Sequence, residues 1–297
     1  MNVTASNREV TLKKIVVTGA LGQLGMALLE QSKHHADFEY IFLSRKDLDI
    51  TSRDNISIVL DKHQPDVVIN TAAYTAVDAA EDDKDQAFLI NEAAVGYLAE
   101  ECKKRKCALI HISTDYVFDG DKSTAYVESD KPNPQTVYGA SKLGGEQLIE
   151  ASNITKYAII RTSWVYSVYG HNFVKTMLRL GEERGQLSVV NDQLGCPTWA
   201  NDLADTILTV ARELKEDSFG VYHFSNKGSI TWYDFAKAIF EHAQIDVLIT
   251  PVTSDLFPTK TKRPKNSVLD THKIEKQFKV DTPEWSSSLQ KMLKRLK

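Results

Sequence analysis

The fold of this chain is decided by the stretch KIVVTGALGQLG, residues 14–25. Its first five residues read as a short buried strand, and an apolar helix pattern begins just after the last glycine. Strand, glycine turn and helix follow one another in the order that a phosphate cradle requires. In such a cradle Gly19 allows a tight turn, Gly22 lets the backbone approach a pyrophosphate, and Gly25 lets the helix pack closely on the strand. The position after the first strand therefore favours dinucleotide binding over an ordinary glycine-rich loop.

Strand and helix patterns alternate after this turn. We predict strands at residues 40–43, 66–70 and 108–112, with helices between them around residues 56–60 and 90–98. Alternation of this kind is typical of an α/β fold with a Rossmann-type, doubly wound parallel sheet.

The chain is expected to have three parts. Residues 1–12 form a polar N-terminal extension, residues 13–165 the dinucleotide-binding Rossmann domain, and residues 166–297 mainly a smaller C-terminal substrate-binding lobe, with some segments returning to the first domain. We assign to the lobe a helix from Asn201, a strand at residues 221–224 and a helix capped by Thr231.

Composition narrows the class of protein. The 297 residues are 42% hydrophobic and 26% charged, with a formal net charge of -4, which describes an ordinary soluble protein without a basic stripe for nucleic acid. The lysine-rich end, residues 291–297, reads as the solvated face of a last helix. The N-terminus lacks an apolar segment, and no run approaches the ~18 apolar residues of a membrane span, so we expect a cytoplasmic protein.

The three cysteines, Cys102, Cys107 and Cys196, support neither a disulfide framework nor a zinc site. Their number is odd and no C-x-x-C spacing occurs. We expect small buried or idle thiols.

The end of the second predicted strand bears on the choice of cofactor. Folds that prefer NAD often place an acid there for the ribose 2′-hydroxyl, whereas this chain has Ser44 and Arg45. An arginine suits a 2′-phosphate, so we expect NADPH to serve at least as well as NADH. Asp47 or Asp49 could supply the missing carboxylate from the following loop.

Tyr138 and Lys142 are the candidate proton-transfer pair. Four residues apart on a predicted helix, they lie one turn apart on the same face. A lysine cation favours the phenolate, so in a partly buried site, with a cofactor charge helping, this pair could exchange protons near neutral pH. By itself such spacing is typical of an ordinary surface pair.

Thr114 strengthens the interpretation of that pair. It follows the strand predicted at residues 108–112 and precedes Tyr138 by 24 residues, enough for a loop to return the chain to the same cleft. A hydroxyl there could bond a carbonyl oxygen that Tyr138 protonates, although a threonine at a strand end also commonly caps a turn. His111, in the middle of the strand among apolar residues, reads as structural.

With these residues in hand, the chain resembles an extended short-chain dehydrogenase/reductase. Blocks in the second half resemble dTDP-4-dehydrorhamnose reductases more specifically: STDYVF at residues 113–118, RTSWVY at 161–166, NDQ-x-G-x-PT at 191–198 and RP-x-x-S at 263–267. The resemblance runs from about Lys13 to the C-terminus. It implies reduction of the C4 ketone of dTDP-4-dehydro-L-rhamnose by NADPH or NADH, the last step in making dTDP-L-rhamnose.

The resemblance also implies roles for individual residues. Tyr138 matches the proton donor, Lys142 the residue that holds the nicotinamide ribose, and Thr114 the hydroxyl that polarises the carbonyl. Asp115 and Trp164 match positions lining the sugar, although a tryptophan at a strand end also commonly packs into a core. Together with the local signals, the expected cofactor-binding residues are Gly19, Gly22, Gln23, Leu24, Gly25, Ser44, Arg45, Asp49, Ile50, Ala72, Ala73, Tyr74, Tyr138 and Lys142.

Arg263 has two readings. A guanidinium matches phosphate oxygens in a bidentate way, so Arg263 could clamp the dTDP diphosphate. The alternative is a loop arginine paired with a surface acid.

One departure from the family pattern concerns metal. Some members form dimers bridged by Mg²⁺ through glutamates, and the matching positions here are Ala27 and Asn201, which lack the carboxylates that Mg²⁺ needs. We therefore expect no metal requirement, and a monomer or weak homodimer. Two other functions stay open from sequence: a non-catalytic dinucleotide-binding regulatory subunit, and a reductase or epimerase of another nucleotide sugar.

Overall fold

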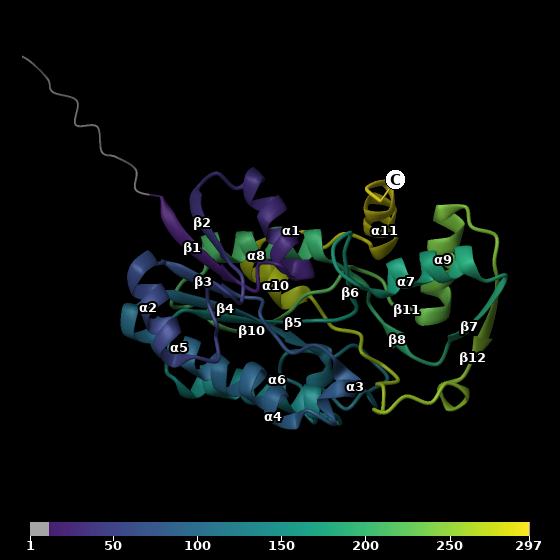
Figure 1. Cartoon of the computed structure of the whole chain (residues 1–297), viewed down its shortest axis with the longest axis horizontal. Helices are drawn as coiled ribbons and strands as arrows, with labels where there is room; N and C mark the ends of the chain where they lie inside the picture. Colours follow the sequence, from purple (N-terminus) through teal and green to yellow (C-terminus); the bar gives the residue numbers. More distant parts are fainter. Residues whose placement is uncertain (1–11, 297) are drawn as a thin grey trace, which may run out of the picture.

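A parallel six-stranded sheet forms the centre of the computed structural model, which describes residues 12–296 (Figure 1). The order across the sheet is β10-β5-β4-β3-β1-β2, and every neighbouring pair is parallel. The strands are β1 (Lys13–Thr18), β2 (Phe38–Leu43), β3 (Val67–Asn70), β4 (Ala108–Thr114), β5 (Tyr157–Thr162) and β10 (Gly220–His223). The predicted α/β, doubly wound fold is confirmed. Apart from Leu12, the predicted N-terminal extension lies outside the described residues.

The chain reverses its direction of travel across the sheet between β1 and β3. From β1 it moves outward to β2, then returns past β1 to build β3, β4 and β5 on the other side. Ligands of doubly wound sheets bind at the carboxyl ends of the strands next to such a switch point. The topology therefore predicts a site beside the glycine turn that follows β1.

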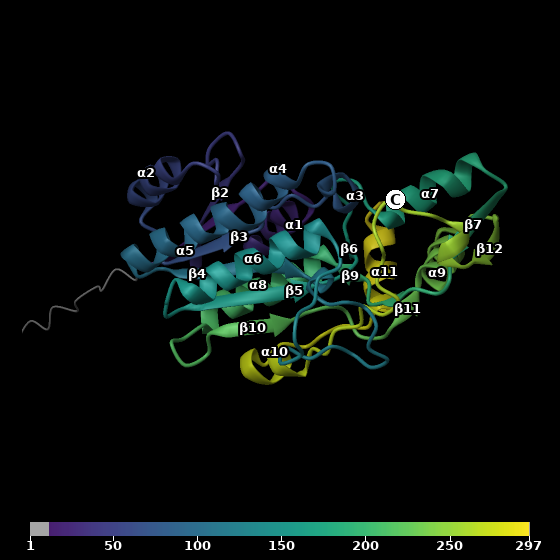
Figure 2. The ribbon, with the colours of Figure 1, turned by 90° about the horizontal axis from the view of Figure 1, so that it is seen from below.

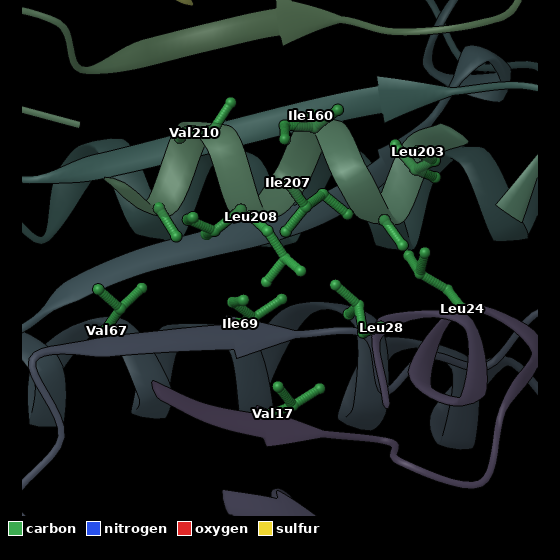
Figure 3. Packing of buried hydrophobic residues seen from close by; sticks show 14 of the residues in the cluster. Val17, Leu24, Leu28, Val67, Ile69, Ile160, Leu203, Ile207, Leu208 and Val210 are labelled. Carbon is green, nitrogen blue, oxygen red and sulfur yellow. The ribbon is translucent and has the colours of Figure 1, made fainter. Parts of the chain in front are cut away.

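Helices cover both faces of the sheet because successive strand side chains point to opposite sides. Val17 and Ile69 pack with the helices of one face, whereas Val16 and Val68 pack with those of the other. Figure 3 shows the first cluster, in which Leu28 meets Leu203 and Ile207 above the sheet. Both faces thus have a continuous apolar core, as expected for buried parallel strands.

The two helical layers are visible from two directions (Figures 1 and 2). One face carries α1 (Gln23–Gln31), α8 (Ala200–Glu213) and α10 (His272–Phe278). The other carries α2 (Arg53–His63), α5 (Ala94–Arg105) and α6 (Val137–Ala151), with the short helices α3 (Val77–Ala80) and α4 (Lys84–Phe88) at its end. A π-helical turn, Leu89–Ala93, joins α4 to α5, so the predicted long helix around residue 90 is interrupted.

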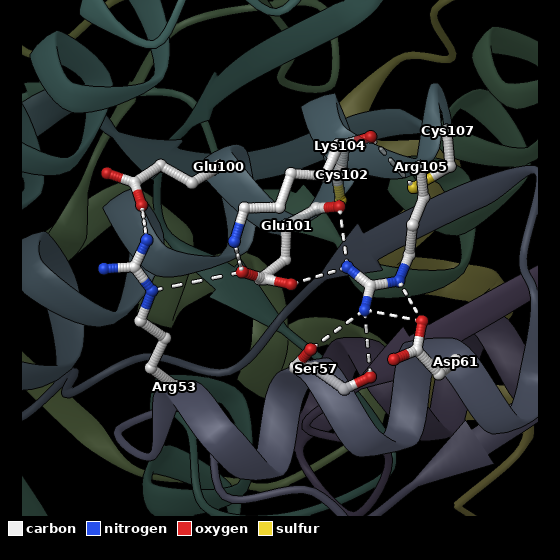
Figure 4. Close-up of polar contacts among 9 residues, drawn as sticks. All are labelled: Arg53, Ser57, Asp61, Glu100, Glu101, Cys102, Lys104, Arg105 and Cys107. Atoms are coloured by element: carbon white, nitrogen blue, oxygen red, sulfur yellow. Dashed lines mark hydrogen bonds and ion pairs between the residues drawn. The ribbon is translucent and has the colours of Figure 1, made fainter.

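A polar network joins α2 to α5 (Figure 4). The Arg105 guanidinium donates to the Asp61 carboxylate over 2.9 Å and to the Ser57 carbonyl over 3.1 Å, and it pairs with Glu101 on its own helix. Since Glu101 is buried and bonded to two cations, its pKa is lowered despite its burial. The network fixes the outer helices at the end of the sheet away from the glycine turn.

A smaller lobe lies beside the carboxyl ends of the strands (Figure 2). Its helices are α7 (Phe173–Glu183), α9 (Trp232–Ala243) and α11 (Trp285–Lys294). Three small sheets pair β7 (Gln186–Val190) with β12 (Leu248–Val252), β8 (Leu194–Gly195) with β11 (Ile230–Thr231), and β6 (Val165–Tyr166) with β9 (Thr198–Trp199). The lobe has a core of its own, built around Phe235, Ile239 and Met292.

Two segments that we assigned to the lobe lie in the Rossmann domain instead. The strand predicted at residues 221–224 is β10, which pairs with β5, and the helix from Asn201 lies within α8. Tyr222 and Phe224 bury their rings in the same cluster as the α8 leucines, so the apolar core of the sheet determines where both segments pack. Within the described residues, no helix is both long and apolar enough to cross a membrane.

A buried ion pair fixes α6 against the sheet. The Arg161 guanidinium on β5 donates to both Glu146 carboxylate oxygens, at 2.9 Å from Nε and 2.6 Å from Nη2, and Ser113 on β4 also donates to this carboxylate. All three side chains are buried. Removing one charge would leave the other unpaired in a low-dielectric interior.

We expect Glu146→Gln to lower the free energy of unfolding by about 3–5 kcal/mol, because it leaves the Arg161 charge buried without a counter-charge. Urea denaturation followed by circular dichroism measures this loss. The matched control is Glu150→Gln, an exposed position one turn further along α6, which should change stability by less than about 0.5 kcal/mol. Equal effects of the two substitutions would contradict the structural role of the pair.

Candidate active site

The glycine turn has the geometry of a phosphate cradle. Gly19 adopts φ +65, and its carbonyl accepts a 2.9 Å hydrogen bond from the Gly22 amide. A Cβ on Gly25 would lie 2.4 Å from the Gly19 carbonyl oxygen, so α1 can pack this closely on the turn only with glycine there. The N-cap of α1 is Gly22, which has no side chain to satisfy the first amides of the helix. These free N–H groups can donate hydrogen bonds to the oxygens of a diphosphate.

A cavity of about 1010 Å³ runs from this turn between the carboxyl ends of the strands and the lobe. Its volume matches the upper end of the range for ligand sites, about 300–1,000 Å³. Ten residues predicted from the sequence line it: Gly22, Gln23, Leu24, Ala73, Thr114, Asp115, Tyr138, Lys142, Trp164 and Arg263. The fold thus brings the glycine turn and the predicted proton-transfer residues to a single cleft.

Lys142 is buried, with 1% of its surface exposed, on the face of α6 that meets β4. Its ammonium nitrogen donates to the Ile112 carbonyl over 2.6 Å and lies 3.2 Å from Nε2 of His111. Burial lowers the pKa of Lys142 to about 8, and the nearby Glu146 carboxylate opposes this shift. The lysine therefore changes charge near physiological pH.

Tyr138 lies one turn before Lys142, half-buried, with its ring edge against Tyr116 at 5.6 Å between centroids. Burial raises the pKa of its phenol, and the Thr114 hydroxyl acts weakly in the opposite direction. In the protein alone, burial thus moves the pKa of the tyrosine away from neutrality. The lowered pKa expected from the sequence requires a cofactor charge as well, and it stays a prediction. A phenol that keeps its proton is suited to act as a proton donor.

Thr114 and Asp115 form a hydrogen-bonded pair at the end of β4. The Thr114 hydroxyl donates to Oδ1 of Asp115 over 2.8 Å and accepts from the Tyr116 amide, so it caps a turn as well as lining the cleft. Burial raises the pKa of Asp115 to about 6. Its Oδ2 has no hydrogen-bond partner among residues 12–296, which leaves one buried carboxylate oxygen available to a ligand.

Trp164 lines the cavity and does not close into a core. Its backbone adopts φ +48, a left-handed conformation that is unusual for a bulky residue. The indole stacks on Trp232 of the lobe, with 3.4 Å between ring centroids and an interplanar angle of 7°. The strained backbone holds the ring at the boundary between domain and lobe.

Arg263 pairs with an acid, as one of the two interpretations from the sequence expected, and its role as a diphosphate clamp stays a prediction. Its guanidinium pairs with the Asp78 carboxylate and donates to the Tyr116 hydroxyl over 2.9 Å, yet it also lines the cleft. These contacts hold the charge at the mouth of the cavity.

The residues at the end of β2 lie outside this cavity. Asp47 accepts hydrogen bonds from the Ser44 amide and hydroxyl, at 2.9 and 2.6 Å, so its carboxylate is engaged within the loop. Asp49 likewise accepts from the Thr51 amide and hydroxyl, which lower its pKa. Arg45 is exposed to solvent. Ile50 is buried in the core.

Ala72 and Tyr74 flank the lining residue Ala73, and Asn91 fixes this segment. Asn91 accepts from the Tyr74 amide and donates to the Tyr74 carbonyl, both over 2.9 Å, and donates to the Ser141 hydroxyl on α6. The π-helical turn directs this side chain inward; such turns are frequent at functional sites.

Sequence reasoning missed several residues of the site. Asn91, Trp232 and Phe173 were not considered, and the contact of His111 with Lys142 was not anticipated. In the lobe part of the cavity the lining is largely apolar and aromatic, including Phe173, Met177, Leu180, Val189 and Trp232. The Trp232 position follows the Thr231 cap that was identified, but an aromatic residue beside a helix cap carries no signal of a ligand.

Comparison with known proteins agrees with this geometry. Residues 13–297 match the family model described as the RmlD substrate binding domain. The chain belongs to this family.

Relatives of the RmlD family match over nearly the full length. A dTDP-4-dehydrorhamnose reductase of Aggregatibacter actinomycetemcomitans is 41% identical over 94% of this chain and 97% of its own. A crystal structure of the Clostridium acetobutylicum enzyme, an RfbD ortholog, is 43% identical, with a TM-score of 0.91 over 95% of this chain and 99% of its own. The Bacillus anthracis reductase, solved in complex with NADP, is 38% identical, with a TM-score of 0.91 over 96% of this chain and 100% of its own.

The positions compared with metal-bridging glutamates are buried in this family member. Ala27 lies in α1 and Asn201 in α8, and these helices pack against each other. Among the described residues, no group of three or more His, Cys, Asp or Glu side chains could hold a metal ion. Activity without a metal stays a prediction.

We expect Asp115→Asn to change the pH dependence of stability. In the folded chain the pKa of Asp115 is raised to about 6 from 3.8, so the folded state binds this proton more tightly than the unfolded state. The resulting stabilisation is present below about pH 4 and is lost as the pH rises through about 6. The variant lacks this loss and should gain about 3 kcal/mol relative to the parent between pH 4 and pH 8, measured by urea denaturation at both values. If the free energies of unfolding of the two proteins changed in parallel with pH, the raised pKa of Asp115 would be contradicted.

Proposed function

We propose that this chain reduces the C4 ketone of dTDP-4-dehydro-L-rhamnose with NADPH or NADH, giving dTDP-L-rhamnose. The observation that carries the proposal is the convergence of Thr114, Tyr138 and Lys142 in the cleft that begins at the glycine turn. Membership of the RmlD family and the names of its relatives support the same substrate.

The residues of the cleft divide the chemistry between them. The nicotinamide cofactor, when bound on the glycine turn, supplies a hydride. The Thr114 hydroxyl holds the carbonyl oxygen, and Tyr138, kept protonated by burial, gives its proton to that oxygen as negative charge develops. Lys142, with its pKa near 8, is an acid strong enough to return a proton toward the phenolate.

Asp115 determines where the Thr114 hydroxyl directs its proton. In the structure the Thr114 proton points to Asp115, so a substrate carbonyl has to draw that proton away or accept one from a protonated Asp115. A carboxyl group with a pKa of about 6 can take either form near neutral pH.

The lobe supplies the grip on the nucleotide. Trp164 offers a flat apolar wall to a deoxysugar, and Arg263 offers a guanidinium to the diphosphate. The apolar lining around Phe173 and Trp232 leaves room for a base. Because these contacts hold the sugar in reacting geometry, a sugar without its nucleotide should be a poor substrate.

We also propose a cellular location, an oligomeric state and a binding partner. We place the protein in the cytoplasm, as a monomer or weak homodimer, with a nucleotide sugar as its partner and neither nucleic acid nor membrane. The intact Thr114, Tyr138 and Lys142 argue against a regulatory subunit that only binds a dinucleotide. A reductase or epimerase of another nucleotide sugar would differ from the proposed enzyme only in the residues of the lobe that line the substrate pocket.

The direct assay mixes the protein with NADPH and dTDP-4-dehydrorhamnose, made in place from its precursor and the 3,5-epimerase, and follows absorbance at the nicotinamide band. We expect oxidation that depends on both the protein and the sugar. No oxidation, with NADPH still bound, would favour a binding module; oxidation with another nucleotide sugar alone would favour a different reductase.

Tyr138→Phe should lower kcat by about 10²–10⁴, since it removes the proton donor and keeps the ring. Binding of NADPH, measured by fluorescence titration, should stay within about twofold of the parent, because a phenylalanine keeps the packing. Tyr97→Phe on α5, outside the cleft, is the matched control and should leave both quantities unchanged. A near-normal kcat in Tyr138→Phe would exclude this residue as the proton donor.

Arg45→Ala should discriminate between the two cofactors. If the exposed guanidinium meets a 2′-phosphate, its loss raises the Kd for NADPH about tenfold and leaves that for NADH within about twofold. Isothermal titration with each cofactor measures the difference, and Lys46→Ala, the exposed neighbour, is the control. Equal losses for NADPH and NADH would contradict a role for Arg45 in selecting the phosphate.

A further inference from the structure

A chain of buried polar side chains connects the glycine turn to the active-site lysine. The Thr18 hydroxyl donates to Oδ1 of Asn70 over 2.6 Å. The Asn70 amide nitrogen lies 3.0 Å from Nδ1 of His111, and Nε2 of the same ring lies 3.2 Å from Nζ of Lys142. Four side chains from β1, β3, β4 and α6 thus form one continuous line.

The register of the sheet places these side chains side by side. Thr18 pairs with Asn70 and Asn70 pairs with His111 in the parallel ladders. Two residues earlier on the same strands, Val16, Val68 and Leu109 belong to the core under α5 and α6, so the polar line faces the same layer of helices. At this level of the sheet, hydrogen bonds among polar side chains take the place of apolar packing, and Lys142 of α6 contacts the last of these side chains.

Burial makes the line costly to break. Thr18, Asn70 and Lys142 are each 1% exposed and His111 is 0% exposed, so solvent does not substitute for a lost partner. A buried polar group without its hydrogen bond costs about 1–3 kcal/mol. A histidine that served only to fill space would not need a polar partner on each ring nitrogen.

The direction of the first bond determines where His111 carries its proton. Since Oδ1 of Asn70 accepts from Thr18, the amide presents an N–H to Nδ1 of the imidazole. Nδ1 must therefore accept. Burial and the neighbouring Lys142 lower the pKa of His111 well below its usual value, so the ring is neutral and its proton lies on Nε2, facing the lysine.

We propose that Thr18 and Asn70 fix the tautomer of His111, and that His111 is a positioning residue that presents Nε2–H to the amine of Lys142. The lysine nitrogen then has its place set by two groups of β4, the imidazole and the Ile112 carbonyl. The first offers a donor and the second an acceptor, a combination that favours the uncharged amine over the ammonium. Only the expected effect on turnover depends on the proposed function.

Other titratable groups lie on the elements that pack around the lysine, and their influence on its pKa must be separated from this effect. They are Tyr138 and Glu146 on α6, Arg161 on β5, Asp115 and Tyr116 on the turn after β4, and Glu92 on the π-helical turn. Glu146 is paired with Arg161, and it opposes the lowering of the pKa of Lys142. None of these groups changes which nitrogen of His111 is protonated.

The tautomer can be observed without any substrate. In long-range ¹H–¹⁵N spectra of protein labelled with ¹⁵N-histidine, we expect His111 to be the Nε2–H tautomer and to stay neutral from pH 6 to pH 8.5. His111→Gln assigns the signal. An Nδ1–H tautomer, or a ring that titrates in this range, would overturn the proposal.

Asn70→Asp provides the decisive variant. A carboxylate can only accept, so it requires Nδ1–H on His111 and leaves a lone pair on Nε2 for the Lys142 ammonium. We expect the tautomer to reverse and the alkaline limb of the kcat profile to move up by about one pH unit, because the lysine stays charged to higher pH.

Asn91→Asp is the matched control, since it adds a buried carboxylate beside α6 without contacting His111. It should keep the Nε2–H tautomer. Unchanged spectra in Asn70→Asp would overturn the proposal, as would an Asn91→Asp variant that reverses the tautomer. If the protein does not reduce the sugar at all, the spectra still decide the tautomer, so the two failures are distinguishable.

Discussion

The buried face of α6 is the constraint on which the rest of the site depends. Lys142 donates to the Ile112 carbonyl over 2.6 Å, and one turn later Glu146 pairs with Arg161 of β5. Desolvating an ammonium and an ion pair is unfavourable, and only the partners supplied by β4 and β5 offset it. The same contacts fix the helix so that Tyr138, one turn before the lysine, meets the cleft. The packing of α6 on β4 and β5 thus determines both the positions and the protonation states of Tyr138 and Lys142.

The central sheet could be predicted from local patterns, and the lobe could not. Alternating strands and helices, with a glycine turn after β1, are sufficient to predict a doubly wound fold, because each pattern reports on burial of its own segment. β10 carries the same kind of pattern but comes late in the chain, after the lobe helix α7. Its pairing with β5 follows from the core around Tyr222, a contact between distant segments. Local periodicity contains no information about such pairing.

Some residues of the site could likewise be predicted from local sequence, and others could not. Tyr138, Lys142 and Thr114 are recognisable because their spacing follows from one helix and one strand end. The pKa of the tyrosine in the protein alone could not be predicted, since it depends on the depth of burial, which spacing does not reveal. The contact of His111 with Lys142 and the inward position of Asn91 were not anticipated for a related reason. One depends on the register of three strands and the other on a π-helical turn, and both features appear only in three dimensions.

In the proposed reaction, a hydride donor on the glycine turn and a proton donor on α6 act on one carbonyl in the cleft between sheet and lobe. The most direct test follows an isotope: NADPH carrying deuterium at the transferred position of the nicotinamide is incubated with the protein and dTDP-4-dehydrorhamnose, and the product sugar is examined by NMR. We expect one deuterium at C4 of dTDP-rhamnose for each NADPH consumed. Deuterium absent from C4, or NADPH consumed without labelled sugar, would contradict it.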